Sequence, residues 1–329
     1  MNRLTKLLFV LGVMLALPGV MRAASVTVDV DQLRYTVDTD NREAELYGPV
    51  SSSTSIVNLT IPDFIEYNGD QYPVTSIRKD AFSTNQNVSG SLTIGNSVTT
   101  IGDGAFNSCS GFTGSLTIGN SVATIGCSAF DGCSGFTGSL TIPNSVITIG
   151  DDAFRSCRGF TGSLAIPNSV ITIGGSAFSR CRGFTGTLTI PDSVTTIGDW
   201  AFSSCSGFTG SLTIGNSVTT IGDWAFTYCS GFTGSLTIPN SVTTIGCSAF
   251  YGCSGFTGSL TIPDSVTTIG DAAFEGCENL TGDLIIGNSV TSIGNNAFRK
   301  CSNLKTATIP AKLKIGENIF PSTTKIIRR

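Results

Sequence analysis

The chain has 329 residues, among them 39 glycines, 11 cysteines and no histidine, and its formal net charge at pH 7 is −4. This slightly acidic balance gives no reason to expect a nucleic-acid partner, which would need a basic surface. The absence of histidine excludes an ordinary Ser-His-Asp triad. So many glycines with so few charged residues would be typical of disorder in an aperiodic chain, whereas here most glycines recur at fixed places.

Residues 1–23 are typical of a Sec signal peptide. Arg3 and Lys6 precede the apolar run Leu7–Leu17, and small residues lead to Ala23 and Ala24, in the order that such a peptide has. The run is too short to cross a membrane comfortably, and no second apolar stretch of about 18 residues follows. We therefore expect a mature chain without an integral membrane span, exported to the cell surface or the extracellular space.

Residues 24–56 are predicted to form an N-terminal β-hairpin cap. Val26, Val28 and Val30 alternate with polar residues, and a second run over residues 33–47 is broken by a turn signal at residues 38–41. Such a cap would cover the apolar end of a stack of repeats. Residues 57–90 are interpreted as an irregular first repeat, in which residues 63–73 are predicted to be an inserted loop.

Residues 91–305 repeat one 24-residue unit nine times without insertion. Self-similarity at a fixed period of this length predicts a solenoid, in which each unit forms one coil and stacks on its neighbours. With the irregular first repeat, we expect about ten coils. The units begin at Ser91, Ser115, Ser139, Ser163, Thr187, Ser211, Ser235, Ser259 and Asp283.

The positions of a unit, numbered from 1, predict a mainly β coil. Positions 1–4 alternate polar and apolar residues, which indicates a short strand with its hydroxyls outside. Glycine or proline at position 5 followed by Asn or Asp predicts a turn, and positions 8–11 form a second short strand. Alanine at 15, phenylalanine at 16 and cysteine at 19 are predicted to make a tight helical turn. Residues 306–329 are interpreted as a final partial repeat and a C-terminal cap.

These phrases resemble a known family. Leu-Thr-Ile-Pro-Asn-Ser-Val-Thr-Thr-Ile-Gly (Leu236–Gly246), then Ala249-Phe250 and Gly252-Cys253-Ser254, are similar to the BspA-like leucine-rich repeats of bacterial surface proteins. The resemblance covers residues 57–320. It implies a leucine-rich repeat superhelix and a role similar to that of cell-surface adhesins, which bind host matrix proteins or other bacteria. It implies no catalytic residue and no cofactor.

The cysteines form a file instead of pairs. In-register side chains point the same way, so bridging them would twist the stack, and we predict buried free thiols that act as small apolar groups. Local bridges from Cys127 to Cys133 and from Cys247 to Cys253 remain open. A linear file does not converge on a metal ion, so no metal site is predicted. Nine cysteines share position 19: Cys109, Cys133, Cys157, Cys181, Cys205, Cys229, Cys253, Cys277 and Cys301.

Binding determinants are expected where the coils differ, at positions 9, 13, 14, 17, 18 and 20, which should be exposed. Trp200 and Trp224 share position 14 in adjacent coils, with Tyr228 and Tyr251 nearby. Exposed aromatic residues of this kind form platforms for sugar rings or hot spots for proteins. The alternative is that the indoles lean over the turn and cover the phenylalanines of position 16.

A second candidate cluster is basic. Arg158 and Arg182 share position 20 in adjacent coils and are flanked by Arg155 and Arg180. Guanidinium groups so placed suit a sulfated glycan, an acidic protein patch or a phosphate. The alternative is a solvated cluster balanced by three nearby acids, Asp131, Asp151 and Asp152.

Catalysis is not expected. The carboxylates lie mostly at position 13, where they are interpreted as turn formers instead of the paired acids that polysaccharide cleavage needs. Ice or mineral binding by the threonine file at position 3 is a weaker possibility, because Ala165 and Ile285 interrupt it. The sequence therefore predicts an exported, non-enzymatic adhesin or protein-binding scaffold without a cofactor. The alternative is a carbohydrate-binding module centred on Trp200 and Trp224.

Overall fold

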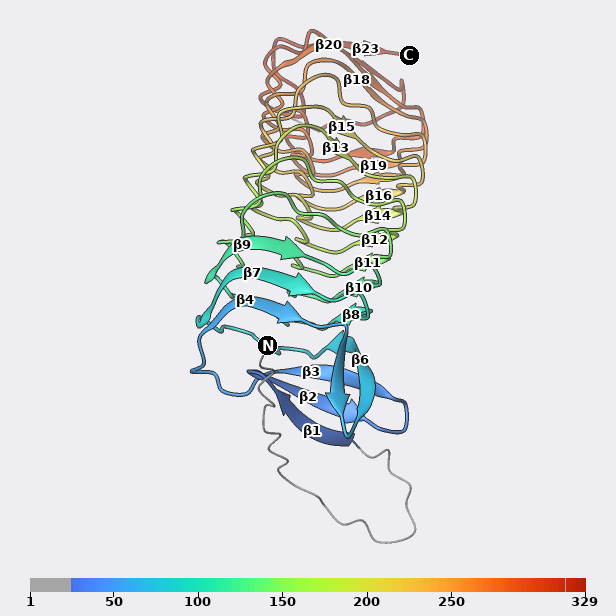
Figure 1. Cartoon of the computed structure of the whole chain (residues 1–329). Helices are drawn as coiled ribbons and strands as arrows, with labels where there is room; N and C mark the ends of the chain where they lie inside the picture. Colours follow the sequence, from blue (N-terminus) through green and yellow to red (C-terminus); the bar gives the residue numbers. More distant parts are fainter. Residues whose placement is uncertain (1–24, 317) are drawn as a thin grey trace.

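The computed structural model describes residues 25–316 and 318–329. The predicted signal peptide, residues 1–23, lies outside the described residues. Within them the chain forms a mainly β solenoid of about ten turns and no helix, and the coils stack from the strands β1–β3 at one end to β23 at the other (Figure 1). The predicted leucine-rich repeat solenoid is confirmed.

One sheet runs the length of the stack, antiparallel among its first three strands and parallel from there on. Its strands in the repeats are only two residues long, because positions 10 and 11 alone pair with the next coil in register, as Thr196–Ile197 does with Thr220–Ile221. The sheet has the order β1 (Ser25–Val30), β2 (Leu33–Asp38), β3 (Glu43–Pro49), β6 (Asp70–Ile77), β8 (Thr100–Ile101), β10 (Thr124–Ile125), β11 (Thr148–Ile149), β12 (Thr172–Ile173), β14 (Thr196–Ile197), β16 (Thr220–Ile221), β17 (Thr244–Ile245), β19 (Thr268–Ile269) and β21 (Ser292–Ile293).

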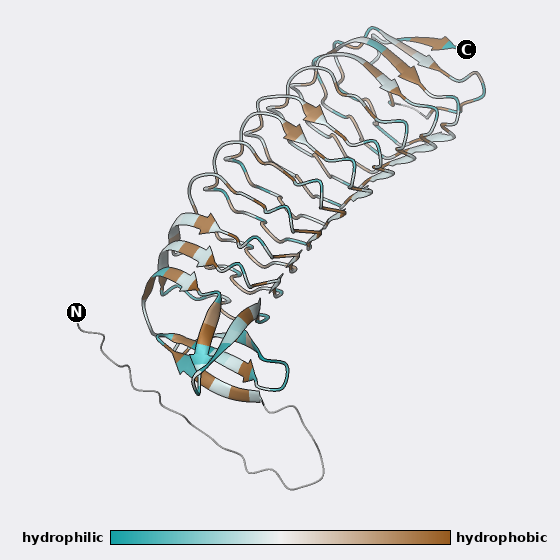
Figure 2. Cartoon of the chain, turned by 45° about the vertical axis from the view of Figure 1, so that its right-hand side comes forward, coloured by the Kyte–Doolittle hydropathy of each residue, from teal (hydrophilic) through white to brown (hydrophobic). Residues whose placement is uncertain are grey.

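The Ser-Leu-Thr-Ile segments form a second, interrupted face. Regular pairing is strongest at the two ends of the stack, and in the middle it thins to isolated bridges such as Thr141 to Ala165. Figure 2 shows the longer arrows at both ends and mostly irregular backbone between them. The groups are β4 (Ile56–Ile61), β7 (Val88–Ile94) and β9 (Phe112–Thr117); β13 (Leu188–Thr189) and β15 (Leu212–Thr213); and β18 (Gly258–Ile262), β20 (Leu280–Ile286), β22 (Thr306–Ile309) and β23 (Lys325–Arg328).

The N-terminal strands differ from the prediction in one respect. β1, β2 and β3 pair antiparallel, and β3 joins the first coil by pairing parallel with β6. The segment expected to be a loop is instead a β-hairpin, in which β5 (Phe64–Tyr67) pairs antiparallel with β6. Its turn is Asn68-Gly69, with φ of 52° and 84°. Two positive φ angles fit the type I′ hairpin turn that an Asn-Gly pair favours.

The predicted helical turn is wrong. Positions 12–19 form successive β-turns, as in the bonds from the Thr227 N–H to the Trp224 carbonyl and from the Cys229 N–H to the Phe226 carbonyl. Every residue at positions 14 and 18 has a positive φ, which no right-handed helix allows. The N–H groups of positions 14, 16 and 18 therefore point along the stack, and that of Phe226 donates to the Ala249 carbonyl of the next coil at 2.7 Å.

The core consists of columns of identical side chains. Phe202 and Phe226 stack with ring centroids 5.4 Å apart and planes 3° from parallel, and the second column repeats this at Phe208 and Phe232, 5.2 Å apart. The columns meet edge to face, as Phe226 does with Phe232. Because each aromatic pair adds about 0.5–1.5 kcal/mol beyond its buried area, the two columns bind every coil to its neighbours.

The cysteine file lies in this core, as predicted. The nine position-19 residues are buried and carry free thiols, and each Sγ donates to the phenylalanine carbonyl of the preceding coil, for example Cys205 to Phe178 at 3.0 Å. Burial raises the pKa of Cys205 to about 12. Cys127 is exposed and Cys247 half-buried, both as free thiols, so neither of the two local bridges forms.

Recurrent polar residues also join neighbouring coils. An Asp199 carboxylate oxygen accepts from the Asp223 N–H at 2.8 Å, and the Ser241 hydroxyl donates to the Val218 carbonyl at 2.7 Å. At position 9, the Thr219 hydroxyl donates to the Thr195 carbonyl at 3.2 Å. The position-13 aspartates, interpreted as turn formers, therefore use their carboxylates to hold the backbone of the next coil.

Two glycines in one coil are expected to tolerate alanine very differently. A Cβ on Gly231 would collide with the carbonyl oxygen of Phe208, whereas Gly234 has φ +79° and open space around it. We expect Gly231→Ala to destabilise by several kcal/mol, because backbone of the preceding coil must move, and Gly234→Ala by about 1–2 kcal/mol of left-handed strain. Urea denaturation of both variants measures this, and equal losses would contradict the close approach of the coils.

Thiol reactivity provides a second check on the core. At about pH 8, a free cysteine with an ordinary pKa is partly ionised and reacts with Ellman's reagent. Burial keeps the position-19 thiols protonated, so only Cys127 and Cys247 are expected to react in the folded protein, and all eleven in urea. A Cys127→Ser, Cys247→Ser double variant should show no fast reaction. Reaction of further thiols before unfolding would contradict the buried file.

Candidate ligand-binding surface

The variable side chains gather on one surface, here called the turn face: the outward side of positions 14, 17 and 18. Arg180, Trp200 and Tyr228 lie on it and are exposed, and they border a groove of about 420 Å³ that crosses four coils. The groove is lined by Arg155, Ser176, Ser179, Arg180, Trp200, Ser203, Ser204, Thr227 and Tyr228. Residues predicted separately as an aromatic and a basic cluster therefore meet at one site.

The two tryptophans stack on each other. Their ring centroids are 4.6 Å apart and their planes 12° from parallel, so each indole covers one face of the other. Trp200 is 41% exposed and lines the groove, while Trp224 is half-buried and does not. The pair therefore presents one indole face to the groove and not the broad two-ring platform that the sequence suggested.

Two tyrosines lie beyond the tryptophans. Tyr228 is 54% exposed and lines the groove, and Tyr251 of the next coil meets it edge to face, with centroids 5.3 Å apart. The neighbouring Tyr251 phenol raises the pKa of Tyr228, chiefly by charge repulsion. Tyr228 therefore remains a neutral phenol that can donate or accept a hydrogen bond at neutral pH, and Tyr251 supports it from outside the groove.

The four predicted arginines divide into two pairs. Arg155 and Arg180 line the groove, whereas Arg158 and Arg182 at position 20 do not. Among the described residues Arg158, Arg180 and Arg182 form no ion pair. Arg155 bonds Asp131 through Nε and Asp152 through Nη1, each at 3.2 Å.

The Arg155 ion pairs support in part the alternative of a balanced cluster. Asp131 and Asp152 take part in it, but Asp151 instead accepts from the Gly175 N–H. Burial raises the pKa of Asp131, against the opposing effect of Arg155. Arg155 is therefore offset by two carboxylates, and Arg180 is the unpaired cation of the groove.

The floor of the groove was missed by sequence reasoning. Position 17 was expected to be exposed throughout, yet Ser179, Ser203 and Thr227 are buried, with exposed fractions of 6%, 4% and 4%. The Thr227 hydroxyl donates to the Ser248 carbonyl. The hydroxyls of Ser179 and Ser203 have no hydrogen-bond partner among the described residues. Three successive small hydroxyl residues at a position that elsewhere carries large or charged side chains were the available signal.

The side chains around the groove occupy unfavourable backbone positions. Arg180, Trp200, Trp224 and Tyr228 have φ between 54° and 64°, a region that bulky residues rarely adopt. Every coil has a positive φ at these positions, so the conformation belongs to the repeat itself. What distinguishes the groove is that large side chains occupy positions that most other coils give to small or short residues, for example Ser248 and Gly252.

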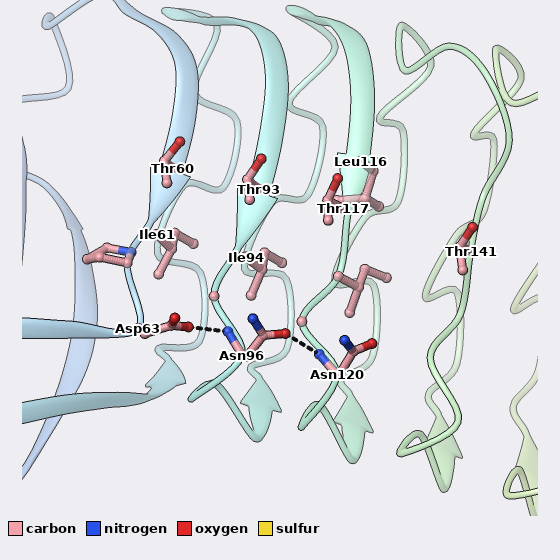
Figure 3. Close-up of a pocket in the computed structure, with 14 residues that line it drawn as sticks. Thr60, Ile61, Asp63, Thr93, Ile94, Asn96, Leu116, Thr117, Asn120 and Thr141 are labelled. Carbon is pink, nitrogen blue, oxygen red and sulfur yellow. Dashed lines mark hydrogen bonds between the residues drawn. The ribbon is translucent and has the colours of Figure 1, made fainter.

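A second hollow lies on the Ser-Leu-Thr-Ile face, with about 600 Å³ between residues 60 and 141. Figure 3 shows Thr60, Thr93, Thr117 and Thr141 in a row along it. Its acidic group, Asp63, accepts from the backbone N–H groups of Asn96 and Ser97, and Asn96 accepts from that of Asn120 at 3.0 Å. These polar groups already hold the coils together. The larger hollow therefore has fewer polar groups available to a ligand than the turn-face groove has.

The described chain has neither a cluster of metal ligands nor a membrane-spanning helix. No three side chains of His, Cys, Asp or Glu come together there as a metal site would require. Nor does that part of the chain contain a helix long and apolar enough to cross a membrane.

The fold is that of a leucine-rich repeat solenoid. The sequence matches a family model described as BspA type leucine rich repeat region, in six copies over residues 51–162, 75–208, 161–234 and 233–328. The chain therefore belongs to the BspA-type leucine-rich repeat family.

Solved structures agree with this assignment. A leucine-rich repeat protein from Bacteroides ovatus ATCC 8483 is 25% identical, with a TM-score of 0.61 over 91% of this chain and 90% of that one. A leucine rich cell surface protein from Faecalibacterium prausnitzii A2-165 is 23% identical, with a TM-score of 0.55 over 93% and 95%. No curated protein matches the chain.

The strain at the groove leads to a prediction about stability. Tyr228→Gly removes a half-exposed side chain and a left-handed penalty of about 1 kcal/mol, so the free energy of unfolding should be unchanged or higher. Phe226→Ala in the same coil should cost about 3–5 kcal/mol, because it empties a buried column. Urea denaturation compares the two, and a loss of more than about 1 kcal/mol in Tyr228→Gly would show that the tyrosine is needed for folding.

Proposed function

We propose that the protein is a non-enzymatic scaffold, exported to the cell surface, whose turn face engages proteins of a host matrix or of other microbes. The observation that carries this proposal is the contrast between constant and variable positions. The core columns repeat almost unchanged, while large aromatic and basic side chains occupy strained positions around one groove. Aromatic and arginine residues are typical of binding hot spots.

The family and the chemistry of the coils both support a non-enzymatic role. Leucine-rich repeat solenoids generally bind proteins and are generally not enzymes. The position-13 aspartates hold backbone N–H groups of the next coil, as Asp223 does for Cys247. Their carboxylates are therefore engaged in structure. Export is supported by the sequence of residues 1–23 and by the cell-surface description of the F. prausnitzii relative.

Carbohydrate binding centred on both tryptophans has less support. The two indoles cover one another at 4.6 Å, so they offer a sugar one free face bordering the groove and not a joint platform. The comparisons add nothing in favour of a carbohydrate-binding module. A sugar partner follows only from the groove as a whole.

Binding to immobilised matrix proteins and to whole bacteria tests the proposal. The mature chain, residues 24–329, should bind at least one of them at physiological salt, and a Trp200→Ser, Tyr228→Gly double variant should bind about tenfold more weakly. The matched control is Thr189→Ala, Thr213→Ala, which changes two exposed threonines on the Ser-Leu-Thr-Ile run of the same two coils. Its binding should equal that of the unaltered chain.

Two results would overturn the proposal. One is equal loss of binding in both double variants, which would place the contact elsewhere. The other is fractionation of the producing cells that finds the chain in the cytoplasm with residues 1–23 still attached.

A further inference from the structure

We propose that the turn-face groove binds an acidic sugar residue, a sugar ring that carries a sulfate or carboxylate group. The inference deepens the proposed function and rests on it, because it names the chemical group that the surface recognises on its partner. Four features of the groove lead to it: its two guanidinium groups, its single free indole face, its two hydroxyls without partners, and its size.

The guanidinium groups provide an anion site. Arg155 bonds Asp131 and Asp152 through Nε and Nη1, which fixes the direction of the side chain and leaves Nη2 free to donate. Arg180, in the next coil, forms no ion pair among the described residues and is the unpaired cation of the groove. A planar guanidinium group matches the paired oxygens of a sulfate or carboxylate. One held arginine and one unpaired arginine are therefore placed to share a single anion.

The indole provides a surface for the ring. Trp224 covers one face of Trp200 at 4.6 Å, and Trp200 lines the groove beside Ser176, which has the same position in the preceding coil. An aromatic face against the C–H face of a sugar combines burial with a polar edge. Tyr228, in the coil on the far side of Trp200, adds a neutral phenol for a ring hydroxyl.

The serines on the floor of the groove favour a sugar over an apolar side chain as the ligand. Ser179 and Ser203 are more than nine-tenths buried, line the groove and have no hydrogen-bond partner among the described residues. An apolar side chain seated there would leave both hydroxyls unpaired, which costs about 1–3 kcal/mol for each group. Sugar hydroxyls both donate and accept, so they satisfy the two serines.

The size of the groove limits the ligand. A volume of about 420 Å³ is near the lower end of the range, about 300–1,000 Å³, that small-molecule sites occupy. One or two sugar rings fit such a space, and a folded domain does not. The groove therefore recognises a terminal or single residue of a glycan, whatever larger molecule carries it.

Intrinsic fluorescence gives a direct measurement, because the chain has only two tryptophans and both belong to this cluster. The mature protein is titrated with a sulfated heparin disaccharide, its desulfated form, sialyllactose and lactose. Saturable binding of the sulfated disaccharide alone identifies sulfate as the anion, and binding of sialyllactose alone identifies carboxylate. Binding of either should weaken when salt is raised from about 50 to about 300 mM.

Variants separate the groove from general charge. Arg180→Gln should weaken binding at least about tenfold, whereas Arg182→Gln, which removes the same charge outside the groove, should change it less than about twofold. Ser179→Ala, Ser203→Ala should weaken binding severalfold, with thermal melts showing that each variant folds. Equal effects of Arg180→Gln and Arg182→Gln, equal binding of the neutral sugars, or no binding of either acidic sugar at millimolar concentration would each overturn the proposal.

Failure here is distinguishable from failure of the proposed function. If a matrix protein stripped of its glycans binds as before, and Arg180→Gln has no effect, the scaffold function stands and the acidic-sugar site is wrong. If an acidic sugar binds in the groove while no matrix protein and no cell is bound, the site stands and the role in adhesion is wrong.

Discussion

The hydrogen bonds between the return segments of adjacent coils are the constraint on which the rest of the structure depends. At positions 14, 16 and 18 the N–H groups point to the next coil, as in Trp224 to Cys247 and Tyr228 to Tyr251. Left-handed residues at 14 and 18 turn them in that direction. This geometry keeps every coil in register with its neighbours, so identical side chains stack into columns and exposed side chains align into rows.

The same constraint explains both the uniformity of the core and the position of the groove. A phenylalanine at position 16 always lies over another phenylalanine, so any change there would disturb three coils. At positions 14 and 18 the side chain points outward, and its identity changes the surface without disturbing the column. Arg155 and Tyr228 belong to coils three units apart, and register alone brings them to one groove.

Periodicity made the fold predictable, and it also set the limit of prediction. The apolar columns, the buried cysteines and the Ser-Leu-Thr-Ile run follow from residues that recur every 24 places. The hairpin at Asn68-Gly69 occurs once and was taken for a loop, although the Asn-Gly pair is a turn signal. The left-handed conformation of positions 14 and 18 was not predicted, because serine and tryptophan are not residues that favour a positive φ. Each groove residue was visible singly, but the burial of Ser179 and Ser203 depends on packing across coils that one unit does not reveal.

The direction of the inter-coil bonds has a mechanical consequence. They run along the axis of the stack, so its interfaces lie in series, and each carries the whole of a pull on the two ends instead of sharing it. Coils would therefore separate singly, and each released unit of 24 residues could extend by about 80 Å at about 3.4 Å per residue. A chain built in this way would lengthen stepwise under load, and each released unit would lower the tension on the coils that remain.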